Sequence, residues 1–235
     1  LAFRVYTEID DEKGLEDAAE DWMDGAGPFP EPYREVARAY GRVFGPERAL
    51  SILERGRREL GRSSLFAMEA GDTLRDLGRM EEAVLEWAAV IGNDGSQVSG
   101  VMRRVREIEE DRETLVLPLL EQLRQPRTSG ARLRAGAQIA LAAGAFGEAK
   151  TLAEAALDGL PDRTRRGFLT ALARQAQEVS AMEVALWAYE TLREDAVDGA
   201  ETRALDQRIT DAALATGDTV RALAAQQSIA DDLPK

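Results

Sequence analysis

A short phrase recurs along this chain at nearly constant intervals, and the recurrence constrains the fold more than any other feature. The phrase begins with a glycine or another small residue and ends in an acid or polar residue followed by alanine. Its two clearest copies are Gly78–Ala83 and Gly144–Ala149, and weaker copies end at Ala49, Ala185 and Ala222. Successive alanines lie 34, 66, 36 and 37 residues apart, and 66 is two periods of 33. A period near 34 residues indicates stacked helical hairpins.

Each period predicts two amphipathic helices. In residues 32–44, apolar side chains three and four positions apart share one face, and Pro46 suits the first turn of the helix that follows. Alternation of β-branched residues is almost absent, so an all-α fold is expected. The predicted helices are 15–23, 32–44, 46–60, 64–77, 80–91, 97–108, 112–124, 131–143, 146–160, 165–179, 182–194, 201–216 and 219–232.

Five copies of this period, in phase over roughly 200 residues, resemble the tetratricopeptide repeat family. The residues that match the family pattern in the second copy are Ala67, Ala70, Gly71, Leu74, Ala83 and Trp87. The third copy departs most, because it lacks the glycine turn and has Pro118 early in its second helix. That copy could also be a plain helix pair or a HEAT-like hairpin. The resemblance implies a right-handed superhelix (α-solenoid) of antiparallel helix hairpins whose first helices line a concave groove.

Two regions are expected along the chain. Residues 1–31 would form a partial, acidic hairpin, with residues 1–9 as the end of a first helix or, alternatively, residues 3–9 as a short strand. Residues 1–32 hold ten acids and two bases, which favours a solvated acidic face over a docking segment. Residues 25–32, with three prolines and two glycines, predict a break. Residues 32–235 would then form about six helix pairs.

Small and large apolar residues are expected to share the core. Small side chains suit the points where two helix axes cross, and large aromatic ones fill the gaps between hairpins. The small residues are Gly71, Ala83, Ala137, Ala149, Ala173 and Ala185, and the large ones are Tyr33, Tyr40, Trp87 and Tyr189.

The composition excludes several classes of function. The chain has no cysteine and no histidine, so it has no thiolate nucleophile, Cys/His zinc site or Ser-His-Asp triad. No phosphate-binding or nucleophile-elbow motif occurs, and Gly92–Ser96 lacks the carboxylates of a calcium loop. We therefore expect no catalytic residue, no cofactor, no metal and no enzymatic activity. A net charge of −13 argues against nucleic acid, and no apolar run is long enough to insert into a membrane.

The arginines suggest a binding surface. If the first helices line a groove, twelve positions face it, and five of these hold arginine. With 27 arginines among 235 residues, chance alone would place about one arginine at these twelve positions. Arginine pairs bidentately with carboxylates, and methionine offers adaptable apolar contacts. The predicted partner-binding residues are Arg34, Arg38, Met68, Met102, Arg106, Arg134 and Arg174. The alternative is that these arginines pair with acids on neighbouring hairpins.

Protein–protein interaction is the function that these features favour. The expected partner is a protein or peptide with an acidic segment, and the ends of the solenoid could also allow self-association. Alternatives are a non-catalytic accessory or ligand-sensing regulatory domain of a larger enzyme or signalling protein. The chain begins at Leu1, which suggests a processed product or fragment, and its 27 arginines against three lysines hint at a bacterial source. Cytoplasm, periplasm and cell envelope all remain open as its location.

Overall fold

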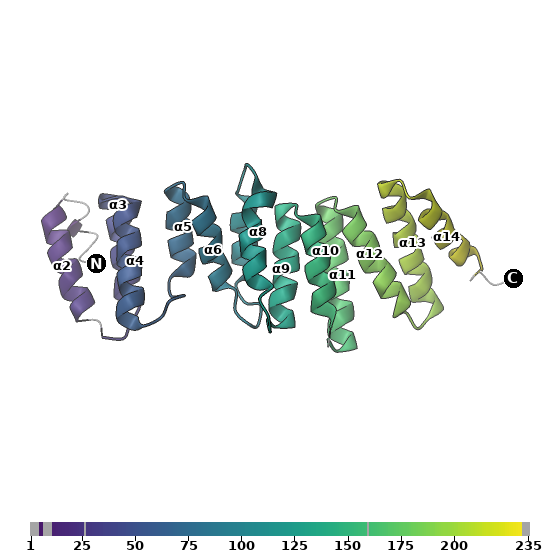
Figure 1. Ribbon diagram of the computed structural model, residues 1–235, viewed down its shortest axis with the longest axis horizontal. Helices are drawn as coiled ribbons and strands as arrows, with labels where there is room; N and C mark the ends of the chain where they lie inside the picture. Colours follow the sequence, from purple (N-terminus) through teal and green to yellow (C-terminus); the bar gives the residue numbers. More distant parts are fainter. Residues whose placement is uncertain (1–4, 7–10, 26, 159, 232–235) are drawn as a thin grey trace. The chain divides into compact units, whose positions relative to one another are not determined.

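The computed structural model describes residues 5–6, 11–25, 27–158 and 160–231, and they divide into two compact units, residues 1–90 and 91–235. The described residues form helices α2 to α14 and contain no strand, which confirms the predicted all-α fold (Figure 1). Unit 1 holds α2 (Glu12–Asp24), α3 (Glu31–Val43), α4 (Pro46–Leu60), α5 (Ala67–Asp76) and α6 (Met80–Val90). Unit 2 holds α7 (Val98–Arg106), α8 (Arg112–Leu123), α9 (Gly130–Ala143), α10 (Phe146–Leu157), α11 (Asp162–Glu178), α12 (Met182–Glu194), α13 (Gly199–Thr216) and α14 (Thr219–Asp231).

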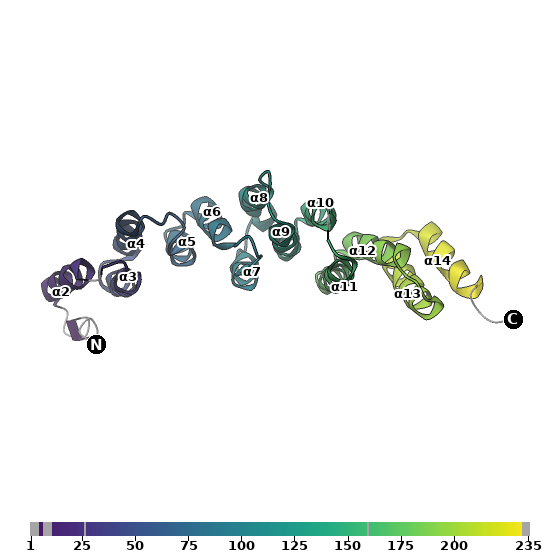
Figure 2. The ribbon, with the colours of Figure 1, turned by 90° about the horizontal axis from the view of Figure 1, so that it is seen from below.

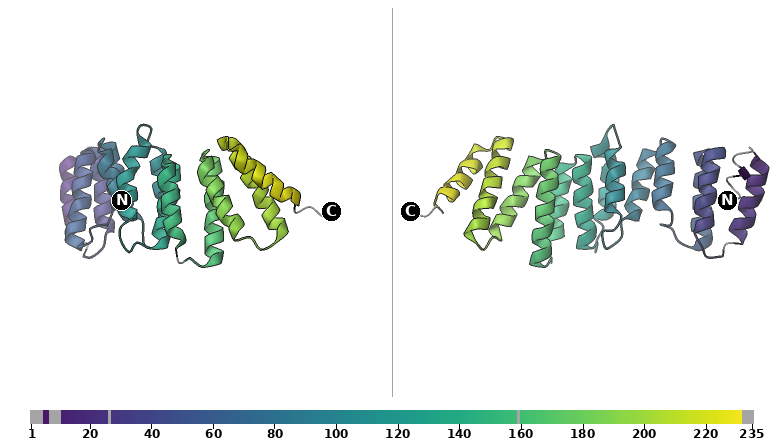
Figure 3. Two further views of the ribbon diagram at one scale, coloured as in Figure 1. Left: turned by 45° about the vertical axis from the view of Figure 1, so that its right-hand side comes forward. Right: turned by 180° about the vertical axis from the view of Figure 1, so that it is seen from behind.

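Neighbouring helices pack as antiparallel pairs within each unit. The pairs are α3 with α4 and α5 with α6 in unit 1, and α9 with α10, α11 with α12 and α13 with α14 in unit 2. Figure 2 shows that, within each pair, the first helix lies lower in the view than the second. Figure 3 shows α13 and α14 side by side from two further directions. These pairs confirm the predicted tetratricopeptide-like fold.

The third copy of the repeat departs from this pattern. Helices α7 and α8 make few contacts with each other, and each packs mainly against α9. Pro118 lies inside α8, where it removes a backbone donor from the helix. Val116, Leu119, Leu120 and Leu123 of α8 are nevertheless fully buried. The predicted departure of this copy is therefore confirmed: α7 and α8 pack against α9 rather than against each other.

The recurring glycine of the repeat phrase ends the first helix of a pair. Gly78 and Gly144 have φ of +74° and +88°, a left-handed backbone that glycine adopts without a steric penalty. In the α11–α12 pair, Ser180 takes this place with φ of +60°. The phrase therefore recurs because the turn between paired helices needs this conformation.

The predicted core residues are buried. Ala83, Ala137, Ala149, Ala173 and Ala185 have no exposed surface, and the four aromatic residues named above are at most 4% exposed. At Gly71, an added Cβ would lie 2.5 Å from two atoms of the Trp87 indole. Glycine at this position thus lets α5 approach α6 closely enough to bury that ring.

The N-terminal region lies only partly within the described residues. Of residues 1–9, the structure describes Val5 and Tyr6, which are helical, so the choice between helix and strand falls mostly outside the described residues. Helix α2 matches the predicted segment 15–23 and packs against α3, with Leu15, Ala19 and Met23 buried. The predicted break separates α2 from α3. The domain boundary after residue 31 stays a prediction.

Candidate partner-binding surfaces

In unit 1, the predicted binding residues Arg34 and Arg38 border one cavity of about 320 Å3 between α3, α4 and α5. Both guanidinium groups already have acidic partners. Arg34 Nε lies 2.6 Å from Glu69 Oε1 on α5, and its guanidinium carbon lies 5.4 Å from the centre of the Phe66 ring. Arg38 Nη1 lies 2.5 Å from Glu35 Oε1 on the same helix. For Arg34, therefore, the alternative prediction of pairing with a neighbouring hairpin is confirmed.

In unit 2, Arg134 borders a second cavity of about 320 Å3 on the side of the first helices. The cavity lies between α9 and α11, beside the loop that precedes α7. Its lining includes the small residues Gly95, Ala131, Ala135, Gly167 and Ala171, the apolar residues Val98 and Phe168, and the polar residues Asp94, Arg134, Gln138 and Thr164. The small side chains leave the space open, and Phe168, 7% exposed, forms an apolar wall.

Arg134 differs from Arg34 and Arg38 in having no acidic partner among the described residues. Its Nη1 is buried and makes no hydrogen bond, and no carboxylate among the described residues lies within 4.0 Å of its guanidinium. A buried donor without an acceptor costs about 1–3 kcal/mol. Asp94 is the acid of this cavity, and it accepts a hydrogen bond from the Ser96 backbone N–H at 2.9 Å, which lowers the pKa of its carboxyl. The α9 side of the cavity therefore carries an unneutralised positive charge.

The remaining predicted residues do not border either cavity. Met68 on α5 and Met102 on α7 are half-buried. Arg106, at the end of α7, is exposed and has no ion-pair partner among the described residues. Arg174 is exposed on α11, and its Nε lies 3.9 Å from Glu178 Oε1. The structure thus brings Arg34 and Arg38 to one cavity in unit 1 and leaves Arg134 alone at a cavity in unit 2.

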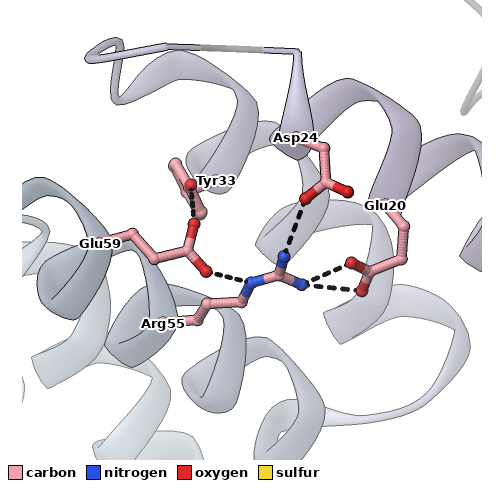
Figure 4. Close-up of polar contacts among 5 residues, drawn as sticks. All are labelled: Glu20, Asp24, Tyr33, Arg55 and Glu59. Carbon is pink, nitrogen blue, oxygen red and sulfur yellow. Dashed lines mark hydrogen bonds and ion pairs between the residues drawn. The ribbon is translucent and has the colours of Figure 1, made fainter.

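Several arginines that the sequence analysis did not single out hold helices together. Arg55 of α4 joins Glu59 of its own helix to Glu20 and Asp24 of α2, at 2.6, 2.6 and 3.4 Å (Figure 4). Tyr33 completes this cluster by donating a hydrogen bond to Glu59. The acids of the N-terminal region are therefore partly neutralised within the chain.

The cluster shifts the pKa of each of its central groups. Burial, followed by the hydrogen bond to Glu59, raises the pKa of the Tyr33 hydroxyl to about 12. The same hydrogen bond, followed by the one from Arg55, lowers the pKa of the Glu59 carboxyl. Hydrogen bonds to Glu20 and Glu59 raise the pKa of the Arg55 guanidinium. All three groups are thus held in the protonation states that the network requires.

Three of the ion pairs between successive repeats share one sequence signal. Arg34 pairs with Glu69, Arg55 with Glu20, and Arg166 with Glu201, and each partner lies 35 residues away. This separation is close to the repeat period, so the two residues occupy nearby places in adjacent hairpins. A search for an arginine and an acid one period apart would have found these pairs.

A third cavity, of about 660 Å3, lies in unit 2 beside the second helices α10, α12 and α14. The repeat pattern of the sequence did not predict this cavity. Its lining includes Phe146, Lys150, Met182, Glu183, Leu186, Trp187, Glu190, Asp218 and Arg221. The sequence signal that could have indicated this cavity is a spacing of four and then three residues on one helix, between Glu183, Trp187 and Glu190.

No group of three or more acidic side chains that could hold a metal ion occurs among the described residues. Within the same residues, no helix has both the length and the apolar character that crossing a membrane requires.

No protein-family model matches the chain, and no curated protein matches it. Among solved structures, the chain is similar to a tetratricopeptide repeat protein from Parabacteroides merdae, with 12% identity and a TM-score of 0.38 over 99% of this chain and 91% of that one. It is also similar to PilW, a type IV pilus biogenesis factor, with 13% identity and a TM-score of 0.32 over 84% of this chain and 90% of that one. TM-scores below 0.5 support no argument about function, and the fold assignment rests on the helix pairs themselves.

Proposed function

We propose that this chain is a non-catalytic protein-binding scaffold that holds an acid-bearing segment of a partner at the cavity between α9 and α11. The observation that carries the proposal is the guanidinium of Arg134 beside that cavity, which has no acidic partner among the residues that the structure describes. A carboxylate of the partner would pair with the guanidinium from the cavity side and neutralise its charge. Arginine and a carboxylate form hydrogen bonds roughly twice as strong as those between neutral groups.

The size and lining of the cavity favour side chains of a polypeptide over a small-molecule cofactor. A volume of about 320 Å3 lies at the low end for small-molecule sites. Phe168 and Val98 offer apolar contact, while Gln138 and Thr164 offer hydrogen bonds. A segment that places one acid against Arg134 and an apolar side chain against Phe168 would use both parts of the lining.

Asp94 gives the cavity a polarity along which a segment could be oriented. Its negative charge lies on the loop before α7, whereas Arg134 belongs to α9. An acid of the partner is repelled from the Asp94 side and attracted to the Arg134 side. We therefore expect one preferred direction for the bound segment.

In unit 1, Arg34 and Arg38 would contribute less to partner binding than Arg134. A partner carboxylate at Arg34 would have to displace Glu69, and one at Arg38 would have to displace Glu35. Partly exposed ion pairs of this kind contribute about 0–1 kcal/mol, so exchange is feasible but brings little gain. Arg106 and Arg174 are exposed and available for rim contacts.

A peptide array tests the proposal. The purified chain and its Arg134→Ala variant are applied to extended peptides in which the number and position of acids vary. We expect the wild type to select peptides with an acid next to an apolar residue, and Arg134→Ala to bind these peptides about tenfold more weakly. Arg58→Ala, which removes an exposed arginine of α4, is the matched control and should bind like the wild type. Equal binding by wild type and Arg134→Ala would reject the site.

A further inference from the structure

The cavity beside the second helices of unit 2 has a chemistry opposite to that of the Arg134 cavity. At about 660 Å3 it has twice the volume. Its walls come from the start of α10, from α12, and from the α13–α14 turn. None of its lining residues borders the Arg134 cavity, so the two surfaces are separate.

One face of α12 supplies an aromatic ring between two acids. Glu183, Trp187 and Glu190 occupy positions i, i+4 and i+7 of this helix, which places their side chains in a row. All three border the cavity. Trp187 is partly exposed, whereas Val184 and Leu186 beside it are at most 2% exposed and form an apolar floor.

The charged groups around this row leave one acid unpaired. Lys150 Nζ lies 3.8 Å from Glu154 on its own helix, and Arg221 Nε lies 3.7 Å from Glu190 and 3.3 Å from Asp218. Glu183 has no ion pair or hydrogen bond among the described residues. The two cations of the cavity thus already face carboxylates, while the carboxylate next to Trp187 has no cation.

We propose that this cavity binds a partner segment that presents an arginine or lysine beside an apolar residue. The cation would lie over the face of the Trp187 indole and pair with Glu183, and the apolar neighbour would contact Leu186 and Met182. An indole is the aromatic ring that attracts cations most strongly, and a nearby carboxylate adds to that attraction. The proposal does not depend on the Arg134 site, because it involves other helices and the opposite charge.

Indole resonances offer a site-resolved test in the full chain. Labelling tryptophan with nitrogen-15 gives signals from Trp22, Trp87 and Trp187, which single Trp→Phe variants assign. The probe is a short synthetic peptide with one arginine flanked by leucines, and its twin carries citrulline, which has the same shape without the charge. We expect the arginine peptide to shift the Trp187 signal saturably and the citrulline peptide to bind about tenfold more weakly.

Trp22 is the internal control for non-specific attraction. It is 41% exposed on the acidic helix α2, so a peptide that binds any negative surface would shift its signal as well. Two variants test the named contacts: Trp187→Ala should weaken binding of the arginine peptide about tenfold, and Glu183→Gln about threefold. Glu113→Gln removes an exposed acid of α8 and should leave the affinity unchanged.

Four results would overturn the proposal. They are equal affinity for the arginine and citrulline peptides, a Trp22 shift that follows the Trp187 shift, no saturable Trp187 shift at millimolar peptide, and a Trp187 signal that changes with protein concentration alone. The last result would mean that a second copy of the chain occupies the cavity. Arg134→Ala should not affect this titration, so failure here and failure at the Arg134 site can be told apart.

Discussion

At the residue scale, the recurring phrase of the sequence marks a backbone conformation. The sequence predicted where paired helices turn, because Gly78 and Gly144 stand where the chain needs a positive φ. Ser180 stands at the equivalent turn with φ of +60° and carries a side chain there. A non-glycine residue in this region costs about 1–2 kcal/mol, of which the greater freedom of glycine in the unfolded chain offsets part.

Replacing Ser180 by glycine should therefore stabilise the protein. We expect Ser180→Gly to raise the free energy of unfolding by about 0.5–1 kcal/mol, measured by urea denaturation. The reverse change at the equivalent turn, Gly144→Ser, should lower it by a similar amount. A destabilising Ser180→Gly would show that the serine side chain contributes more to this turn than the backbone strain costs.

The Tyr33 hydroxyl should make stability sensitive to alkaline pH. Its pKa is 10.0 in the unfolded chain and about 12 in the folded protein, so the unfolded state loses the proton first. The stabilisation is complete below pH 10 and is lost as the pH rises from 10 towards 12. In urea denaturation at several pH values, Tyr33→Phe should cost about 1 kcal/mol near neutral pH through its lost hydrogen bond. The free energy of unfolding of Tyr33→Phe should also fall less steeply above pH 10 than that of the wild type. If the two fell in parallel, the loss of stability at alkaline pH would not come from Tyr33.

At the element scale, apolar periodicity predicted the helices well and their ends less well. Helices α4 and α12 span the predicted residues. Helix α10 ends at Leu157 rather than residue 160, because Pro161 disfavours helical backbone just before it and instead precedes the first turn of α11. The sequence did not predict that α7 and α8 pack against α9 rather than against each other, because periodicity identifies a buried face but not the helix that covers it.

Contacts between helices also include polar side chains that periodicity cannot assign. Arg57 of α4 binds Glu86 of α6 with two hydrogen bonds, of 2.7 and 2.5 Å, and donates another to the Leu65 carbonyl at 2.6 Å. Its side chain is only 16% exposed. This one guanidinium therefore links two helices and the loop between α4 and α5.

Removing Arg57 should destabilise unit 1. Arg57→Ala leaves the Glu86 carboxylate and the Leu65 carbonyl without their donors, and we expect a loss of about 1–3 kcal/mol in thermal or urea unfolding. Arg79→Ala is the matched control, because Arg79 also pairs with a glutamate, Glu82, but on an exposed helix surface. It should unfold like the wild type. Equal effects of the two variants would mean that the Arg57 contacts contribute no more than a surface pair.

At the scale of the whole molecule, the sequence predicted an arginine-bearing binding surface but not which arginines are available. Position in the repeat placed Arg34 and Arg134 alike, yet Glu69 neutralises the first, and no acid in the described part of the chain neutralises the second. Whether such an arginine is neutralised depends on an acid one repeat period away. The apolar periodicity of a single helix carries no information about that acid. The third cavity was missed for a related reason, because its walls come from four helices, α10, α12, α13 and α14, that only the fold brings together.

Charge reversal at the two candidate cavities would show whether Arg134 or the pair Arg34 and Arg38 holds the acid of a partner. Fluorescence anisotropy would measure the affinity of the chain for the acid-bearing peptide that the array selects, in the wild type, in Arg134→Glu and in the double variant Arg34→Glu/Arg38→Glu. We expect Arg134→Glu to bind at least about tenfold more weakly, while the double variant stays within about threefold of the wild type. The reverse order, with Arg134→Glu unchanged and the double variant inactive, would contradict this expectation and place the acid-binding surface in unit 1.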